Sequence, residues 1–397
     1  MPSSDAERAA QSAKILTVAA HAAFVPIGVV TVLLSPLLPT LSARWSLNYS
    51  QAGALFTAQF LASTVAVGLS GVLVARRGFR FAIKVGLLVI AVSIALLLAG
   101  SRLWGIACIA GYGAGLGLAV PAANLLVAEV NPGRRSAALN LLNFSWSAGA
   151  VACPFLVAAA GHFHQVPLLL AVVAGLSLVV AIGIAVMPSW VAEPATTGIA
   201  GSKNLAVDWR HRSLPALLAL FFLYVGAENG FGGWVASYAS SLGSMSSTMA
   251  VMTPSFFYSA LMLGRWLAPA LLRRVDEVRV AKGGLLLACA GMAGLVVSHT
   301  LVGVMVSASA AGLGLSAVYP ITISLLSREF GAAASRVGSL TFTLANVGGA
   351  CLPWLVGVSS TQFGTLKAGL GVPLIAAGLA LVVYTRDWSP APAVLQG

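Results

Sequence analysis

Residues 220–238 read LFFLYVGAENGFGGWVASY and belong to a long apolar run that begins near Leu214. A carboxylate, Glu228, and an amide, Asn229, lie inside this run. An acidic residue in an apolar segment of membrane-spanning length is energetically costly and is usually functional. Nearby glycines would let a neighbouring helix or a ligand approach the backbone, namely Gly226, Gly230, Gly232 and Gly233. The stretch therefore predicts a membrane-spanning helix that can hold a polar solute.

The composition of the 397-residue chain also indicates a membrane protein. Hydrophobic residues make up 59% of the chain and charged residues only 8%, and the mean hydropathy is +0.95. A soluble domain carries about 25% charged residues. The basic residues behind the formal charge of +12 lie in short loops between apolar runs. That distribution is typical of a membrane protein, so we expect no nucleic-acid partner.

The sequence contains no pattern that would supply enzymatic chemistry. It has no glycine-rich phosphate loop, zinc-type spacing or hydrolase elbow. The four cysteines fall inside apolar runs without metal-like spacing and are interpreted as packing residues: Cys108, Cys153, Cys289 and Cys351. We therefore expect a protein that is not an enzyme and that holds no metal or cofactor.

Apolar runs of about 20 residues, the length of a spanning helix, recur along the whole chain. They predict an all-α membrane protein with twelve transmembrane helices in two pseudo-symmetric six-helix halves. The halves are residues 1–188 and 213–397, joined by a polar linker at 189–212. The first run is expected to stay in the protein as a helix bent by its prolines. The predicted spans are 15–39, 49–75, 81–100, 103–129, 135–160, 165–187, 214–240, 249–272, 280–298, 300–327, 335–360 and 366–385.

The distribution of lysine and arginine predicts the orientation of these spans. Of the 22 basic residues, 18 fall on the side of the two termini. Only Arg44, Arg102 and Lys367 fall on the other side, and Arg265 lies within a span. Because cytoplasmic loops carry an excess of basic residues, we expect both termini in the cytoplasm and a multi-pass protein of the cell inner membrane.

The two halves share short sequence patterns. Residues 117–121 (GLAVP) resemble residues 314–320 (GLSAVYP), and residues 149–154 (GAVACP) resemble residues 348–353 (GGACLP). The offset stays close to 199 residues, about half the chain. Two related six-helix halves are typical of transporters that bind their solute between the halves and rock around it.

One loop resembles a known signature. Residues 71–80 (GVLVARRGFR) are similar to the loop motif of the major facilitator superfamily, Gly-x-Leu-x-Asp-Arg-x-Gly-Arg, with Ala75 in place of the aspartate. A degenerate second copy lies at residues 264–274 (GRWLAPALLRR). The resemblance implies a secondary transporter that works by alternating access.

A narrower resemblance suggests the solute. Residues 224–228 (YVGAE), followed by Trp234, are similar to the seventh helix of cation-coupled sugar porters, the fucose-permease and sodium–glucose branch, and residues 139–143 (LNLLN) fit the same branch. This implies symport of a small polar solute, first of all a sugar, with a proton or sodium. The alternative is export of amphipathic compounds or drugs. Against it, residues 108–110 lack the buried arginine of drug antiporters, and the motif before Pro154 is degenerate.

Polar and aromatic side chains near mid-depth are the candidate site. Glu228 stands about 20 Å from the cytoplasmic side at 1.5 Å per residue, so it is a candidate for both solute binding and cation coupling. His21 is the second candidate for coupling. Amides and aromatic rings suit sugar hydroxyls and sugar faces. The candidate solute-binding residues are Gln59, Asn143, Trp146, Glu228, Asn229, Trp234, Tyr238, Tyr319 and Asn346.

Arg265 is the one basic residue well inside a span. Counting residues separates it from Glu228 by about 9 Å along the membrane normal, so we expect a gating or packing role for it instead of an ion pair with Glu228. The candidate gate residues are Arg76, Arg80, Glu129, Arg265 and Glu329. Among these, Glu129 and Glu329 would form ion pairs that break when the cytoplasmic side opens. We expect a monomer whose partners are its solute and the lipid bilayer.

Overall fold

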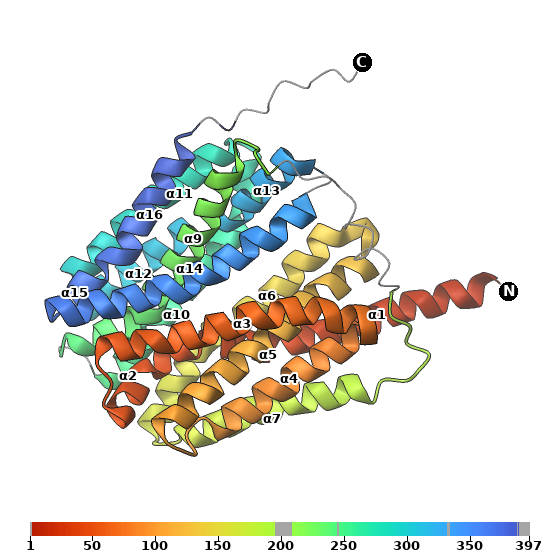
Figure 1. Cartoon of the computed structure of the whole chain (residues 1–397), viewed down its shortest axis with the longest axis horizontal. Helices are drawn as coiled ribbons and strands as arrows, with labels where there is room; N and C mark the ends of the chain where they lie inside the picture. Colours follow the sequence, from red (N-terminus) through yellow and green to blue (C-terminus); the bar gives the residue numbers. More distant parts are fainter. Residues whose placement is uncertain (1, 195–208, 244–245, 332–333, 387, 389–397) are drawn as a thin grey trace.

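The computed structural model describes residues 2–194, 209–243, 246–331, 334–386 and 388, and within these ranges it contains helices and no strand (Figure 1). Twelve helical stretches are long and apolar enough to cross a membrane, which confirms the predicted number of spans. The helices are α1 (Pro2–Val32), α2 (Leu34–Trp45), α3 (Tyr49–Arg77), α4 (Phe79–Leu96), α5 (Arg102–Val130), η1 (Pro132–Arg134), α6 (Arg135–His162), α7 (Val166–Ala185), α9 (Leu214–Ser241), α10 (Ser247–Leu272), α11 (Glu277–Val297), α12 (Leu301–Leu315), α13 (Val318–Phe330), α14 (Ala334–Phe363), α15 (Leu366–Gly369) and α16 (Gly371–Tyr384).

Prolines interrupt three of the predicted spans, and one of these is the twelfth, where α15 and α16 are separated at Leu370 just before Pro373. The first run divides into α1 and α2 at Leu33, just before Pro36, because Pro36 has no N–H to donate one turn back to Val32. The tenth run divides into α12 and α13 in the same way, just before Pro320. Pro26 lies inside α1 without ending it. Helix α1 also begins at Pro2, well before the predicted start at residue 15, so the polar lead is helical.

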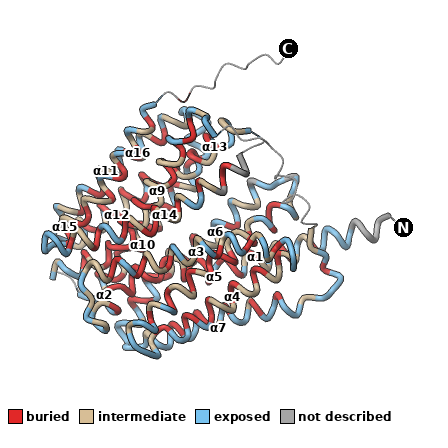
Figure 2. The backbone as a smooth tube through the Cα atoms, in the orientation of Figure 1, coloured by how far each residue is buried: buried red, intermediate tan, exposed pale blue. Residues whose placement is uncertain are grey.

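The helices form two halves, α1–α7 and α9–α16 (Figure 1). Figure 2 shows that buried residues gather where helices of one half face each other, and that exposed residues follow the outer surface. Gly149 and Gly348, which begin the two similar segments 149–154 and 348–353, occupy equivalent positions in the two halves. A Cβ on Gly149 of α6 would lie 2.2 Å from the Val25 carbonyl oxygen of α1, and one on Gly348 of α14 would lie 2.1 Å from the Phe222 carbonyl oxygen of α9. Each glycine therefore lets its helix lie directly against the first helix of its own half. The predicted linker, residues 189–212, lies mostly outside the described residues.

The halves pack against each other at one end of the molecule, where α3 begins and α14 ends; we call it the contact end. Ser50 N–H donates to Thr361 Oγ1 at 2.9 Å, and Thr57 Oγ1 donates to the Ala350 carbonyl at 2.9 Å. The opposite end carries the start of α1 and the end of α16, and we call it the termini end. Figure 1 shows α3 and α14 lying close together at the contact end and separating towards the termini end.

The loop between α3 and α4, which carries the motif at residues 71–80, is held in place by Glu193 at the start of the linker. Glu193 accepts hydrogen bonds from the backbone N–H groups of Phe79 and Arg80 at the first turn of α4, at 2.6 and 3.3 Å. The Arg80 guanidinium lies 3.9 Å from the same carboxylate and donates to the Met187 carbonyl at 3.0 Å, just beyond α7. A carboxylate suits the positive end of a helix dipole. Ala75 takes no part in these contacts; the linker supplies the acid.

Candidate functional site

An ion pair lies between the middle of α9 and the inner part of α10. Arg265 Nη2 is 3.9 Å from Glu228 Oε1, and the two side chains are 25% and 13% exposed. The separation of about 9 Å inferred by counting residues is therefore wrong for the charged groups. Side chains lean towards the N-terminus of their helix. Because α9 and α10 are antiparallel, Glu228 leans towards the termini end and Arg265 towards the contact end, so the long arginine closes the gap.

The indole of Trp146 connects this ion pair to the other half. The Arg265 guanidinium carbon lies 5.8 Å from the centre of the Trp146 ring, within the range of a cation–π interaction. Trp146 is on α6, in the first half, and its Nε1–H donates to Thr31 Oγ1 of α1 at 3.2 Å. Arg265 thus contacts groups from both halves.

Two tyrosines form an aromatic wall beside the ion pair. The rings of Tyr224 and Tyr319 lie 5.5 Å apart, and Phe221 packs against Tyr319 at 5.7 Å. Tyr224 is only 2% exposed, and its hydroxyl lies beside Glu228 and Arg265 without a hydrogen bond of normal geometry to any described residue. Buried hydroxyls are normally paired, so an unused group at this position is available to a water or a ligand.

A chain of hydrogen bonds extends from Trp146 through the first half. The Thr31 hydroxyl accepts a hydrogen bond from the Trp146 indole N–H. The Thr31 backbone carbonyl accepts one from Gln59 Nε2 at 3.3 Å. The side-chain oxygen of Gln59, Oε1, accepts from the Tyr112 hydroxyl at 3.2 Å. Gln59 is 3% exposed and its amide is held at both ends, so its orientation is fixed.

Polar groups of both halves line a small pocket next to this network. Its walls include Thr31, Ser35 and Gln59 from the first half and Asn229 and Tyr258 from the second. Its volume is about 10 Å³, room for about one water. A solute the size of a sugar would need the halves to separate here, so the pocket is closed in this conformation.

Two predicted solute-binding residues make packing contacts instead. Trp234 Nε1–H donates to the Pro353 carbonyl at 2.9 Å, and its ring packs against Tyr49 and Phe56 of the other half. It therefore belongs to the contact end, where the halves are sealed. The Tyr238 hydroxyl donates to the Val296 carbonyl at 3.2 Å and ties α9 to α11. Both side chains are 1% exposed.

The other predicted polar residues border the site. Asn143 lies one turn before Trp146 on α6, is exposed, and donates to the Leu139 carbonyl of its own helix at 2.9 Å. Asn229 likewise donates to the Val225 carbonyl at 2.8 Å while it lines the pocket. Asn346 is half-buried one turn before Ala350 on α14.

His21, the second predicted coupling residue, lies in α1. Its Nδ1 is 2.8 Å from the Ser145 hydroxyl, next to Trp146 in the sequence. This contact ties the His21 ring to α6 within the first half.

The candidate gate residues lie towards the termini end, except Arg265. Glu129 pairs with Arg135 at 3.1 Å within the first half. Glu329 accepts a hydrogen bond from the Ser213 hydroxyl at the start of α9. Arg76 is exposed at the end of α3. The described contacts of these residues stay within one half, and the gating role stays a prediction.

The residues of the site that were not predicted from the sequence include Thr31, Tyr112, Tyr224 and Tyr258. Tyr224 had a usable signal, because it lies four residues before Glu228 and so shares its helix face. The others are single polar residues in apolar helices, and no spacing relates them to one another.

Comparison with known proteins gives a consistent result. Residues 21–353 match the family model described as Major Facilitator Superfamily. The chain is 28% identical over 373 residues to a glucose/galactose transporter of Brucella abortus biovar 1 (strain 9-941), covering 88% of each chain. Its fold is similar to that of the nucleoside transporter NupG, with a TM-score of 0.74 at 15% identity over 94% of this chain and 98% of the other. It is also similar to that of the E. coli fucose:proton symporter FucP, with a TM-score of 0.65 at 19% identity and the same coverage.

Proposed function

Because the chain belongs to the Major Facilitator Superfamily, we propose that it carries a small polar solute, first of all a sugar, across a cell membrane by alternating access coupled to a proton or sodium gradient. The full-length similarity to a glucose/galactose transporter supports a sugar as the solute class. In the predicted orientation, the separated termini end is cytoplasmic, and the conformation is inward-facing.

The observation that carries this proposal is the contact of Arg265 with both Glu228 and Trp146, since it joins the second half to the first at mid-membrane depth. A charged pair is costly to keep in a membrane unless it has a use. At 3.9 Å the pair is too long for a hydrogen bond, so both groups keep hydrogen-bonding capacity for a ligand.

These groups fit the chemistry of a sugar. The Arg265 guanidinium offers N–H donors in a planar fork, and the Glu228 carboxylate offers acceptors for hydroxyl groups. The rings of Trp146 and Tyr319 offer flat apolar surfaces for the C–H faces of the solute. The unused Tyr224 hydroxyl adds a further donor or acceptor. A solute held by groups from both halves would favour the conformation in which they converge, which is the requirement for alternating access.

We assign cation coupling to the same pair. A proton or sodium ion on Glu228 cancels the charge that holds Arg265. The guanidinium is then free to bind solute oxygens, so cation and solute favour each other's binding. When the cation leaves, the pair re-forms and the solute loses its donor. His21, held by Ser145 beside Trp146, is the second position at which a proton could enter this site.

A thermal-shift screen tests the assignment of the solute. Purified protein is heated with sugars, organic acids and amphipathic drugs, each at two pH values and with or without sodium. A ligand that binds only the folded protein raises its melting temperature. We expect stabilisation by at least one hexose or pentose, increased by lower pH or by sodium. Stabilisation by amphipathic drugs alone would overturn the sugar assignment in favour of export.

A further inference from the structure

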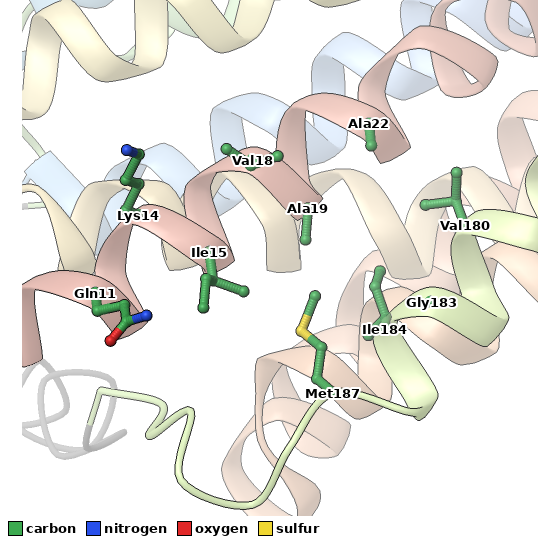
Figure 3. A pocket seen from close by; sticks show the side chains of 10 residues that line it. All are labelled: Gln11, Lys14, Ile15, Val18, Ala19, Ala22, Val180, Gly183, Ile184 and Met187. Carbon is green, nitrogen blue, oxygen red and sulfur yellow. The ribbon is translucent and has the colours of Figure 1, made fainter. Parts of the chain in front are cut away.

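A second and larger cavity lies away from the solute site, between α1 and α7 (Figure 3). Its volume is about 540 Å³. Figure 3 shows Gln11 and Lys14 at one end of this groove and Ala22 and Val180 towards the other. The groove lies wholly within the first half, so the contact between the halves does not close it.

Small side chains create the groove. Ala19 and Ala22 of α1 face Gly183 of α7 across it, and a Cβ on Gly183 would meet nothing within 4 Å. Larger apolar side chains complete the walls, namely Ile15, Val18, Ile184 and Met187. The space is thus a feature of the sequence of both helices.

The groove opens onto the surface that faces lipid. On α1, Val18 lies in its wall and is 60% exposed. On α7, the large apolar side chains beside the groove are also exposed: Val179 at 66%, Ile182 at 50% and Val186 at 72%. Exposed apolar stripes on spanning helices contact hydrocarbon, so the medium at the mouth of the groove is the lipid bilayer.

Polarity changes along the groove as it does along a phospholipid. Gln11 and Lys14 are exposed at the termini end of α1, and from Ile15 onward the walls are apolar. From Gln11 to Ala22 the helix rises about 16 Å, close to half of the roughly 30 Å hydrocarbon thickness, which is one leaflet. The Lys14 ammonium is the charged group among the lining residues, and it complements an anionic headgroup.

We propose that this groove is a binding site for an anionic phospholipid of the surrounding bilayer. One acyl chain lies along Val18, Ala19 and Gly183. The phosphate contacts the Lys14 ammonium, and the Gln11 amide donates to the headgroup. Glu7, two turns before Lys14, is the nearest acid on the same helix face, and it lies outside the lining residues. The inference is independent of which solute the protein carries.

Native mass spectrometry of the purified full chain tests the proposal. The protein is titrated with phosphatidylglycerol and with phosphatidylcholine that carries the same two acyl chains. We expect the first to bind about fivefold more tightly, the effect of one basic residue near an anionic headgroup. Lys14→Gln should remove this preference without removing lipid binding. Gly183→Leu should lower the binding of both lipids, because the leucine fills the groove.

Two matched variants serve as controls. Lys367→Gln removes a lysine at the contact end, and Gly175→Leu makes the same change on α7 where a Cβ also meets nothing within 4 Å. Both should bind lipid as the wild type does. The proposal is overturned if Lys14→Gln keeps the full preference, or if Gly183→Leu and Gly175→Leu have equal effects. It is also overturned if Gly183→Leu abolishes a dimer instead of a lipid adduct, since the occupant is then a second copy.

Discussion

The Arg265 guanidinium lies 3.9 Å from the Glu228 carboxylate, in the interior of the second half and beside the aromatic wall formed by Tyr224 and Tyr319. The two helices bring these groups together from different depths, because the antiparallel arrangement directs both side chains into the same layer.

The interaction between Arg265 and Glu228 should be measurable as a change in melting temperature. Arg265→Gln leaves the largely buried Glu228 carboxylate without its counter-charge. An unpaired buried charge lowers the free energy of unfolding by several kcal/mol. We expect the melting temperature to fall by roughly 5 °C or more. The double variant Arg265→Gln with Glu228→Gln should melt higher than the single one, because no lone charge remains. Glu228→Gln alone completes the cycle, and losses that add up in the double variant would mean that the two side chains do not interact.

The Trp146 indole should act as a binding surface for the solute. Trp146→Ala removes the ring that faces Arg265 and its hydrogen bond to Thr31. We expect the affinity for the solute found in the thermal-shift screen to fall about tenfold. Trp146→Phe should lose less, because a flat face remains. The control is Trp266→Ala on α10, whose side chain is 72% exposed. Unchanged affinity in Trp146→Ala would remove Trp146 from the site.

Close backbone contact at Gly357 should hold the contact end shut. A Cβ there would lie 2.2 Å from the Tyr49 carbonyl oxygen of α3, so Gly357→Leu forces α3 and α14 apart. A reporter cysteine at Ser50, in a background without the four native cysteines, should then react several-fold faster with a membrane-impermeant maleimide. Gly175→Leu, with free space around it, is the control. Identical labelling rates in the two variants would contradict the role of the α3–α14 contact as the closed barrier.

The contact between Glu193 and α4 should stabilise the first half. Glu193→Ala removes the acceptor for two backbone N–H groups, and we expect a loss of about 1 kcal/mol. Gly78→Ala should cost at least as much, since Gly78 has φ +84 and its Cβ would lie 2.6 Å from the Glu193 carboxylate. Denaturation of both variants measures this. Wild-type stability in both would show that the linker does not brace this loop.

The sequence predicted much of the fold because apolar run length is a strong signal in a membrane protein. The twelve spans follow from it, whereas the two halves were inferred from repeated glycine–proline patterns and from the polar linker. The breaks at Leu33 and before Pro320 depend on a single missing N–H and were placed only by the structure. Prolines inside α1 and α5 leave those helices continuous, so proline alone does not mark a break.

The site was predicted less completely, for two physical reasons. Counting residues along a helix gives the depth of a Cα atom but not that of the charged group. The Arg265 guanidinium reaches Glu228 because it lies at the end of a long side chain. Helix-face position also depends on the partner helix. Trp234 shares a helix with Glu228, yet it packs against Tyr49 and Phe56 because the halves are closed at that end in this conformation. No spacing within one helix carries that information.

The central claim is that Glu228 couples the cation to the solute. The most direct test compares accumulation and exchange of radiolabelled solute in proteoliposomes that contain wild-type protein, Glu228→Gln, or the control Glu7→Gln, which changes an exposed acid near the start of α1. We predict that folded Glu228→Gln no longer accumulates solute against its gradient but still exchanges it across the membrane, because the halves can rock when the site is permanently neutral. Glu7→Gln should accumulate solute as the wild type does. Wild-type accumulation by well-folded Glu228→Gln would contradict the claim.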